Sequence, residues 1–164
     1  MNLLKPVILF GFAAAVIFAV YSIFFPPAEK VIAKRLKGLA GAISANPGGN
    51  IARVANASKI GGFFHPNVQI SLQGFGREAA SVSGRGELEE MALAARQNVG
   101  GIKVQFYNIE ILVAEDKTAA RVNLTALVNL DNREDAVVQP MRMEMEKVER
   151  SWLIRSVVPG ASPP

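Results

Sequence analysis

The residue best suited to acid–base chemistry in this chain is His65, because it is the only histidine in the sequence. An imidazole titrates near neutral pH, and it can act as a general base when a second group orients it or donates a proton beside it. Tyr107 could supply the phenol for such a partnership. The other interpretation is that His65, directly before Pro66, is a turn residue and that Tyr107 is an ordinary strand aromatic. We favour this second interpretation, in which neither residue is catalytic.

Composition excludes several other kinds of site. The chain has no cysteine, and therefore no disulfide, no thiolate metal site and no nucleophilic thiol. With a single histidine as well, no metal cluster and no Ser-His-Asp arrangement can be assembled. Residues 74–79 match the letters of a dinucleotide fingerprint, but a short strand is expected after them where that site needs a helix. We therefore expect no cofactor and no metal, and the lack of a basic stripe interleaved with aromatics argues against nucleic-acid binding.

Apolar side chains in the second half of the chain could line a ligand pocket. They lie on expected strands, where every second residue points to the same face. Methionine is prominent among them, and a methionine-rich wall can adapt to an apolar ligand. The same residues could equally form a plain packed core, so both interpretations stay open. The candidate lining residues are Phe106, Val122, Leu124, Ala126, Met141, Met143 and Met145.

These strands belong to a longer series of expected elements. Apolar residues recur at helical spacing in three segments, 29–44, 50–60 and 87–99, which predicts helices there. In the second helix we expect Ile51, Val54 and Ala55 to face inward. Alternation of apolar and polar residues indicates six strands. They are expected at 68–72, 78–83, 102–113, 119–130, 136–149 and 152–158. A sheet with one apolar and one polar face is expected to be antiparallel and covered by helices on one side.

Before all of these elements stands an uncharged apolar run of 19 residues, from Val7 to Phe25. As a helix it would be roughly 28 Å long, close to the thickness of bilayer hydrocarbon. The run is longer than the apolar segment of a cleaved signal peptide, and no small-residue cleavage pattern lies near its end. The sequence therefore predicts an uncleaved signal anchor in residues 1–27, a single-pass transmembrane helix, with one folded domain at 28–159 and a disordered tail at 160–164.

Basic residues are concentrated directly after this anchor. Residues 28–77 carry a net charge of +6, and residues 78–164 a net charge of −3. The membrane-proximal basic residues are Lys30, Lys34, Arg35 and Lys37. They could attract anionic lipid, or they could form an ordinary solvated helix face. Basic residues flank both ends of the anchor, but a short N-terminal tail is typical of an exported domain. We therefore expect the domain on the periplasmic or extracytoplasmic side of the cell membrane.

Three stretches of the sequence resemble the nuclear transport factor 2-like (SnoaL-like) superfamily. They are Phe63 to Val68 (FFHPNV) after the second helix, Gly86 to Glu90 (GELEE) at the start of the third, and Trp152 to Val157 (WLIRSV) in the last strand. The order of elements is similar too. The resemblance implies an α+β fold, in which a cone-shaped curved antiparallel sheet packs on three helices, as in a cystatin-like roll.

The resemblance also implies where function would reside. Enzymes with this fold usually place an acid or histidine where the second helix meets the first strand, and this chain has His65 and Asn67 there but no carboxylate. Such domains often dimerise through the outer face of the sheet. Here that face would carry Tyr107, Asn123, Thr125, Leu127, Arg142, Glu144 and Glu146. Membrane-tethered relatives include bacterial secretion scaffolds, so a protein partner in an envelope assembly is a further expectation.

We therefore expect a membrane-tethered, non-catalytic binding or assembly module, bacterial in origin, with a homodimer through the sheet face as one expected assembly. The alternative is an envelope enzyme, or a carrier of a small apolar ligand, that uses the cone as its pocket and His65 as its base. A third interpretation is a small accessory domain whose role could be inferred only from a neighbouring gene, and the sequence does not distinguish it from the first. Fold alone does not decide among these interpretations.

Overall fold

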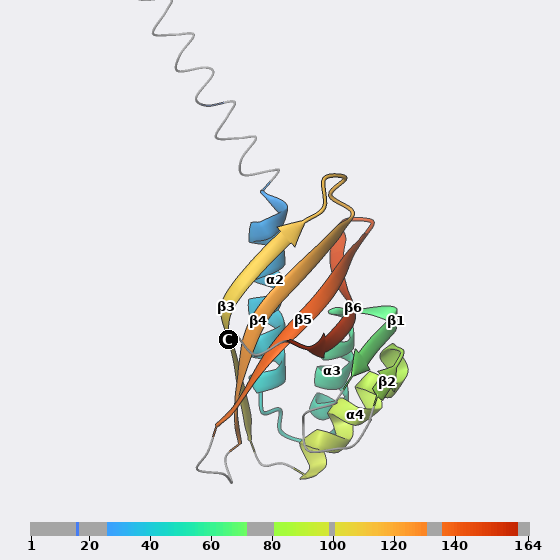
Figure 1. Cartoon of the computed structure of the whole chain (residues 1–164). Coiled ribbons are helices and arrows are strands. Elements are labelled where there is room, and N and C mark those ends of the chain that lie inside the picture. The colour runs from blue at the N-terminus through green and yellow to red at the C-terminus, as the bar shows by residue number, and fades with distance from the viewer. Residues whose placement is uncertain (1–15, 17–25, 72–80, 99–100, 131–135, 161–164) are drawn as a thin grey trace, which may run out of the picture.

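The helices and strands follow one another in the order that the sequence predicts (Figure 1). The computed structural model describes residue 16 and residues 26–71, 81–98, 101–130 and 136–160. Three helices are present there, α2 (Ala28–Ser44), α3 (Asn50–Gly61) and α4 (Arg85–Asn98). The strands are β1 (Phe64–Ser71), β2 (Ser81–Ser83), β3 (Ile102–Val113), β4 (Ala119–Leu130), β5 (Val137–Val148) and β6 (Ser151–Pro159).

Some of the predicted segments lie outside the residues that the structure describes. Apart from Val16, the anchor run at 7–25 lies outside the described residues, as do residues 74–79 and the tail after Gly160. None of the helices in the described part of the chain is both long and apolar enough to span a bilayer.

The six strands form one curved sheet in the order β2-β1-β6-β5-β4-β3. Strands β3 to β6 are joined by antiparallel pairing, as predicted. Strand β1, however, runs parallel to β6 and pairs Ile70 with Val157, so the expectation of a wholly antiparallel sheet is wrong. No hairpin joins these two strands, because β2, α4 and β3 to β5 lie between them in the chain. Their relative direction is therefore not set by a turn, and the sheet is mixed.

Helix α2 lies against the inner face of the sheet and forms the centre of the core (Figure 1). Ile32, Leu36 and Leu39 are almost completely buried, as their helical spacing predicts. They share one hydrophobic core with inner residues of the sheet such as Val122 and Ile154. Full burial of such side chains contributes about 1.5 to 3 kcal/mol each, so this packing fixes α2 on the sheet.

Helix α3 packs with a different face from the predicted one. Ile51 is 89% exposed, and Val54 and Ala55 are exposed as well, so their predicted inward orientation is wrong. Asn56 is buried instead, and its Nδ2 donates a hydrogen bond of 3.1 Å to the carbonyl oxygen of Ala42. That carbonyl belongs to the last turn of α2, where backbone acceptors lack partners within the helix. The buried face of α3 thus contains this polar contact together with Ala57, Ile60 and Gly61.

Helix α4 contributes to the same junction through Arg96, which is only 8% exposed. Its Nη2 donates hydrogen bonds to the carbonyl oxygens of Ala42, at 3.3 Å, and Ile43. A positive charge is favourable at this end of a helix, and burial lowers the pKa of the guanidinium. Arg96 and Asn56 thus connect all three helices at the C-terminus of α2.

Candidate functional site

The inner face of the sheet, where the sequence places a possible pocket, is filled by packed side chains. Five of the candidate lining residues are buried in the hydrophobic core. They are Val122, Leu124, Ala126, Met143 and Met145. Met141 and Phe106 are partly buried and pack against this core. None of the five buried residues lines either of the two cavities described below.

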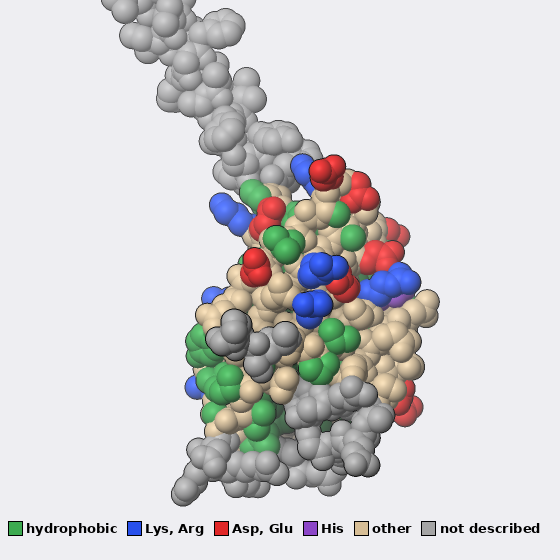
Figure 2. Space-filling view, viewed as in Figure 1, with side chains coloured by type: hydrophobic (Ala, Val, Ile, Leu, Met, Phe, Trp, Pro, Cys, Tyr) green, Lys and Arg blue, Asp and Glu red, His purple; other side chains and the backbone are tan. Residues whose placement is uncertain are grey.

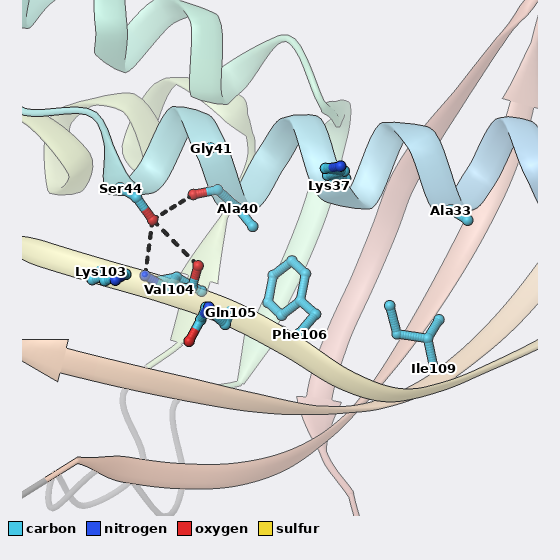
Figure 3. A pocket seen from close by; sticks show the side chains of 10 residues that line it. All are labelled: Ala33, Lys37, Ala40, Gly41, Ser44, Lys103, Val104, Gln105, Phe106 and Ile109. Atoms are coloured by element: carbon cyan, nitrogen blue, oxygen red, sulfur yellow. Dashed lines mark hydrogen bonds between the residues drawn. The ribbon is translucent and has the colours of Figure 1, made fainter.

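The larger cavity is a groove beside this core, between α2 and the edge strand β3 (Figure 3). Its volume is about 570 Å³. On the helix side the wall is made by small residues, among them Ala33, Ala40 and Gly41. On the strand side Phe106 and Ile109 point toward the helix (Figure 3). Of the predicted lining residues, Phe106 is the one that the groove shares.

Four of the residues that line this groove are polar, and two of these four are cationic. Lys37 and Lys103 line it, one from each wall. Ser44 connects the walls, because its Oγ accepts a hydrogen bond of 2.8 Å from the backbone N–H of Val104. Among the described lining residues there is no carboxylate and no imidazole. The groove can therefore hold an apolar or weakly anionic molecule, but it offers no acid–base pair.

A sequence signal for this groove exists, although the sequence reasoning above missed it. Ala33, Ala40 and Gly41 recur at helical spacing on the flank of α2, beside the buried residues. Small side chains at these positions leave the space that larger ones would fill. On β3 the antiparallel register shifts between Tyr107 and Glu110, and this irregularity was not apparent from the alternating pattern.

The two candidate catalytic residues lie on different parts of the sheet. His65 belongs to β1 and Tyr107 to β3, with β6, β5 and β4 between them. At about 4.8 Å per strand, this separation is roughly 19 Å across the sheet. His65 Nδ1 accepts a hydrogen bond of 3.1 Å from the backbone N–H of Asn67, and the Tyr107 hydroxyl donates one of 2.9 Å to Gln105. The structure thus does not bring the two together.

The described residues also contain no candidate metal site. Across residues 26–71, 81–98, 101–130 and 136–160, no three His, Asp or Glu side chains are placed so that they could hold a metal ion.

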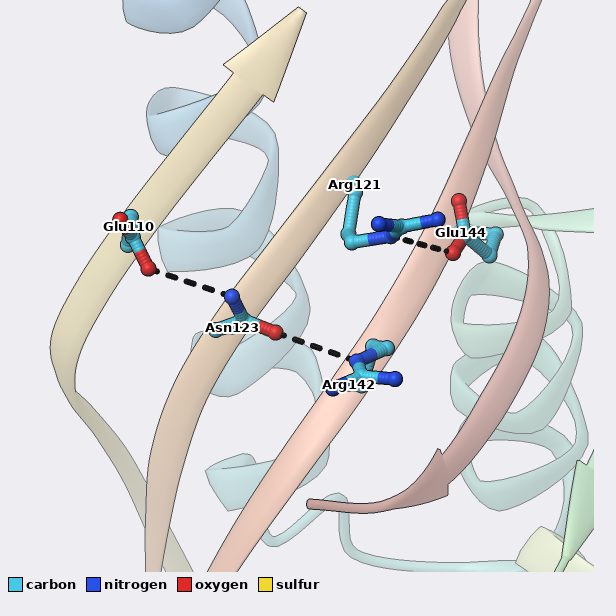
Figure 4. A network of polar contacts seen from close by, with 5 residues as sticks. All are labelled: Glu110, Arg121, Asn123, Arg142 and Glu144. Carbon is cyan, nitrogen blue, oxygen red and sulfur yellow. Dashed lines mark hydrogen bonds and ion pairs between the residues drawn. The ribbon is translucent and has the colours of Figure 1, made fainter. Parts of the chain in front are cut away.

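The outer face of the sheet carries a network of polar side chains that crosses three strands (Figure 4). Asn123 on β4 is its centre, because Nδ2 donates to Glu110 at 3.2 Å and Oδ1 accepts from Arg142 at 3.4 Å. Beside it, Arg121 Nε donates to Glu144 Oε1 at 2.8 Å, and this hydrogen bond raises the pKa of Arg121. These groups are exposed, so they contribute little to stability. They are available instead to a binding partner.

Apolar side chains accompany the network on the same face. Val138 is 59% exposed, and the register pairs it with Leu127. Tyr107 is exposed and pairs with Thr125. On the face seen in Figure 2, charged side chains gather over the upper part and apolar ones over the lower left. A mixture of apolar and charged side chains of this kind is found at protein–protein interfaces.

The membrane-proximal basic residues lie along the first three turns of α2 and have different surroundings. Lys30, Lys34 and Lys37 are exposed. Arg35 is half-buried, and its Nη2 donates a hydrogen bond of 2.6 Å to the carbonyl oxygen of Gly62. Its guanidinium carbon lies 5.0 Å from the centre of the Phe63 ring, within the range of a cation–π contact. Arg35 therefore makes contacts that stabilise the fold, in addition to carrying one of the positive charges of this basic group.

Comparison with known proteins gives a fold but no close relative. No protein-family model matches the sequence, and no curated protein is similar to it in sequence. Among solved structures, Aln2 from a Streptomyces species is similar with a TM-score of 0.64 at 14% identity, over 82% of this chain and 90% of that one. A domain of unknown function with a cystatin-like fold from Nostoc punctiforme has a TM-score of 0.63 at 12% identity, over 83% of this chain and 78% of that one. A proposed scytalone dehydratase from Novosphingobium aromaticivorans has a TM-score of 0.57 at 14% identity, over 80% and 83% of the two chains.

Proposed function

The chain has the fold of the nuclear transport factor 2-like superfamily, and from this premise we propose that it is a membrane-tethered binding or assembly module without catalysis. The observation that carries the proposal is the filled inner face of the sheet. Val122 is completely buried there and Met145 is 2% exposed, and both pack in the core with α2. The packing of Val122 and Met145 in the core with α2 leaves no room for a substrate at this part of the concave face. Binding is therefore assigned to the outer surfaces.

The tether in this proposal is the apolar run from Val7 to Phe25. Helix α2 begins at Ala28, directly after the Pro26-Pro27 pair that would end such an anchor. The folded domain would then stand close to the membrane, on the extracytoplasmic side. Fusion of alkaline phosphatase after Pro164 tests the orientation, since the reporter is active only after export. An inactive fusion in intact cells would contradict the proposed side.

The outer face of the sheet is the proposed binding surface, and a second copy of the chain is its simplest partner. Val138 and Leu127 would supply apolar contact area, and the network around Asn123 would supply hydrogen bonds. Sedimentation of the full-length chain in density-matched detergent measures this directly. We expect a dimer, and we expect Val138→Arg to give a monomer with unchanged thermal unfolding.

Ile51→Arg is the matched control, because Ile51 is also an exposed apolar residue but lies on α3. It should leave the dimer intact. A wild-type chain that sediments as a monomer at concentrations well above micromolar would contradict the proposed dimer. A complex with a different polypeptide at the same face would support the assembly function, with that polypeptide and not a second copy of the chain as the partner.

A second candidate function is a carrier of a small apolar ligand, and the groove between α2 and β3 favours it. Its volume of about 570 Å³ lies in the range of small-molecule sites. Replacing Ala40 by Phe would fill the groove and should abolish ligand binding. His65 does not line the groove, so His65→Ala should leave binding unchanged. Loss of a catalysed reaction in His65→Ala would favour the enzyme alternative instead.

A further inference from the structure

A second cavity, of about 300 Å³, lies between the start of α2 and the turn that joins β5 to β6. Its lining combines three basic side chains, Lys34, Arg35 and Arg150, with the aromatic rings of Phe63 and Trp152. The basic residues come from segments more than a hundred positions apart in the sequence. The fold therefore creates this concentration of positive charge, and no short sequence motif predicts it.

The positive charge in this cavity is not neutralised by the part of the chain that the structure describes. No acidic side chain is among the described lining residues, and Lys34, Arg35 and Arg150 form no ion pair there. The arginines of the outer sheet face differ in this respect, because Arg121 contacts Glu144 and Arg155 contacts Glu146.

Arg35 shows most clearly the effect of positive charge that is not neutralised. Its Nε is buried and has no hydrogen-bond partner among the described residues. Burial lowers the pKa of this guanidinium, and the charge of Arg85 lowers it further. Both effects oppose the charged form, and an anion held beside Arg35 would offset them. Arginine is well suited to this role, since its planar guanidinium matches the oxygens of a phosphate.

We propose that this cavity binds a phosphate group, either that of an anionic phospholipid headgroup or that of a free phosphate compound. Lys34, Arg35 and Arg150 would hold the phosphate oxygens, and Phe63 and Trp152 would contact the organic part. Lys34 follows the apolar run at 7–25 by nine residues, so the cavity would lie near the headgroups if that run spans the membrane. Phosphate binding itself does not depend on this anchor, nor on the proposed assembly function.

Trp152 provides a probe of this site, because it is the only tryptophan in the chain and it lines the cavity. The full-length protein in nonionic micelles would be titrated separately with inorganic phosphate, with phosphatidylglycerol and with phosphatidylcholine, at constant ionic strength. Binding would be followed by Trp152 fluorescence and by calorimetry. Saturation with phosphatidylglycerol alone supports a lipid headgroup, saturation with inorganic phosphate alone supports a free phosphate, and saturation with both supports the shared chemistry.

The double variant K34Q/R150Q tests the residues, since both side chains are exposed and contribute no described hydrogen bond to the fold. We expect it to weaken binding by about tenfold or more, because two charged donors are lost. R53Q/K59Q removes the same charge on α3, outside the cavity, and should change the affinity less than about twofold. Equal weakening by both variants would show non-specific attraction and overturn the proposal. So would a lack of saturation with both phosphate ligands, or an equal response to phosphatidylcholine.

Discussion

Replacement of Met145 by alanine would distinguish a packed inner face from the wall of a ligand pocket. Met145 is 2% exposed, and the register places it between Ala120 on β4 and Ile154 on β6. Truncation of a buried methionine costs about 2 to 5 kcal/mol, because transfer energy and packing are both lost. The strands on either side restrict relaxation, so we expect about 3 kcal/mol. For a domain of about 140 residues this lowers Tm by roughly 10 °C.

Thermal unfolding of the full-length chain, followed by circular dichroism in nonionic detergent, measures this shift. Met141→Ala is the control, because Met141 is on the same strand but only partly buried. It should cost about 1 kcal/mol and lower Tm by roughly 3 °C. Equal, small shifts in both variants would refute the reasoning. They would indicate that Met145 borders empty space, as a pocket residue does.

Three further predictions concern the helix junction, the β3–β4 turn and α3. Arg96→Met removes the hydrogen bonds to the carbonyl oxygens of Ala42 and Ile43. It should lower the free energy of unfolding, measured in urea, by about 2 to 3 kcal/mol. Asn56 would keep its own hydrogen bond to Ala42 in this variant. A loss below about 1 kcal/mol would mean that this end of α2 does not depend on Arg96. The backbone N–H of Thr118, and after it the Thr118 hydroxyl, lower the pKa of Asp116 below the ordinary value of 3.8. The ionised Asp116 side chain therefore stabilises the fold above pH 3.8, and this contribution is lost as the pH falls through the lowered pKa. Tm measured against pH should fall less steeply below about pH 4 in Asp116→Asn, and an unchanged profile would contradict this. Ile51→Gln should change the free energy of unfolding by less than about 0.5 kcal/mol, because Ile51 is exposed. A larger loss in urea unfolding would indicate that Ile51 faces the core, as the sequence predicts.

Regular periodicity made most of the fold predictable. The bounds of β3 and β4 agree with the prediction, because long alternating stretches with clear turns leave little ambiguity. The buried stripe of α2 was predicted for the same reason. The nuclear transport factor 2-like resemblance, drawn from element order and three short stretches, is confirmed in its fold.

The errors arose where long-range contacts decide the outcome. Asn56 is buried with a hydrogen bond to a carbonyl of α2, a contact between segments that periodicity does not record, and periodicity alone ranks Ile51 above it. The parallel pairing of β1 with β6 depends on how a distant segment returns to the sheet, which no local pattern records. The groove beside β3 is likewise a product of packing. The helical spacing of Ala33, Ala40 and Gly41 could have indicated one wall, but the strand that faces it follows only from the fold, and Phe106 is the one predicted lining residue that the groove contains.

The most direct test of the central claim is native mass spectrometry of the full-length chain, released gently from its own membranes. A tethered assembly module should appear as a dimer, or with a second polypeptide, and without an apolar adduct; a bound phosphate compound would belong to the second cavity and is compatible with assembly. This is the result that we expect. A monomer that carries a co-purified apolar molecule of a few hundred daltons would contradict the claim, and it would favour the groove between α2 and β3 as the functional site.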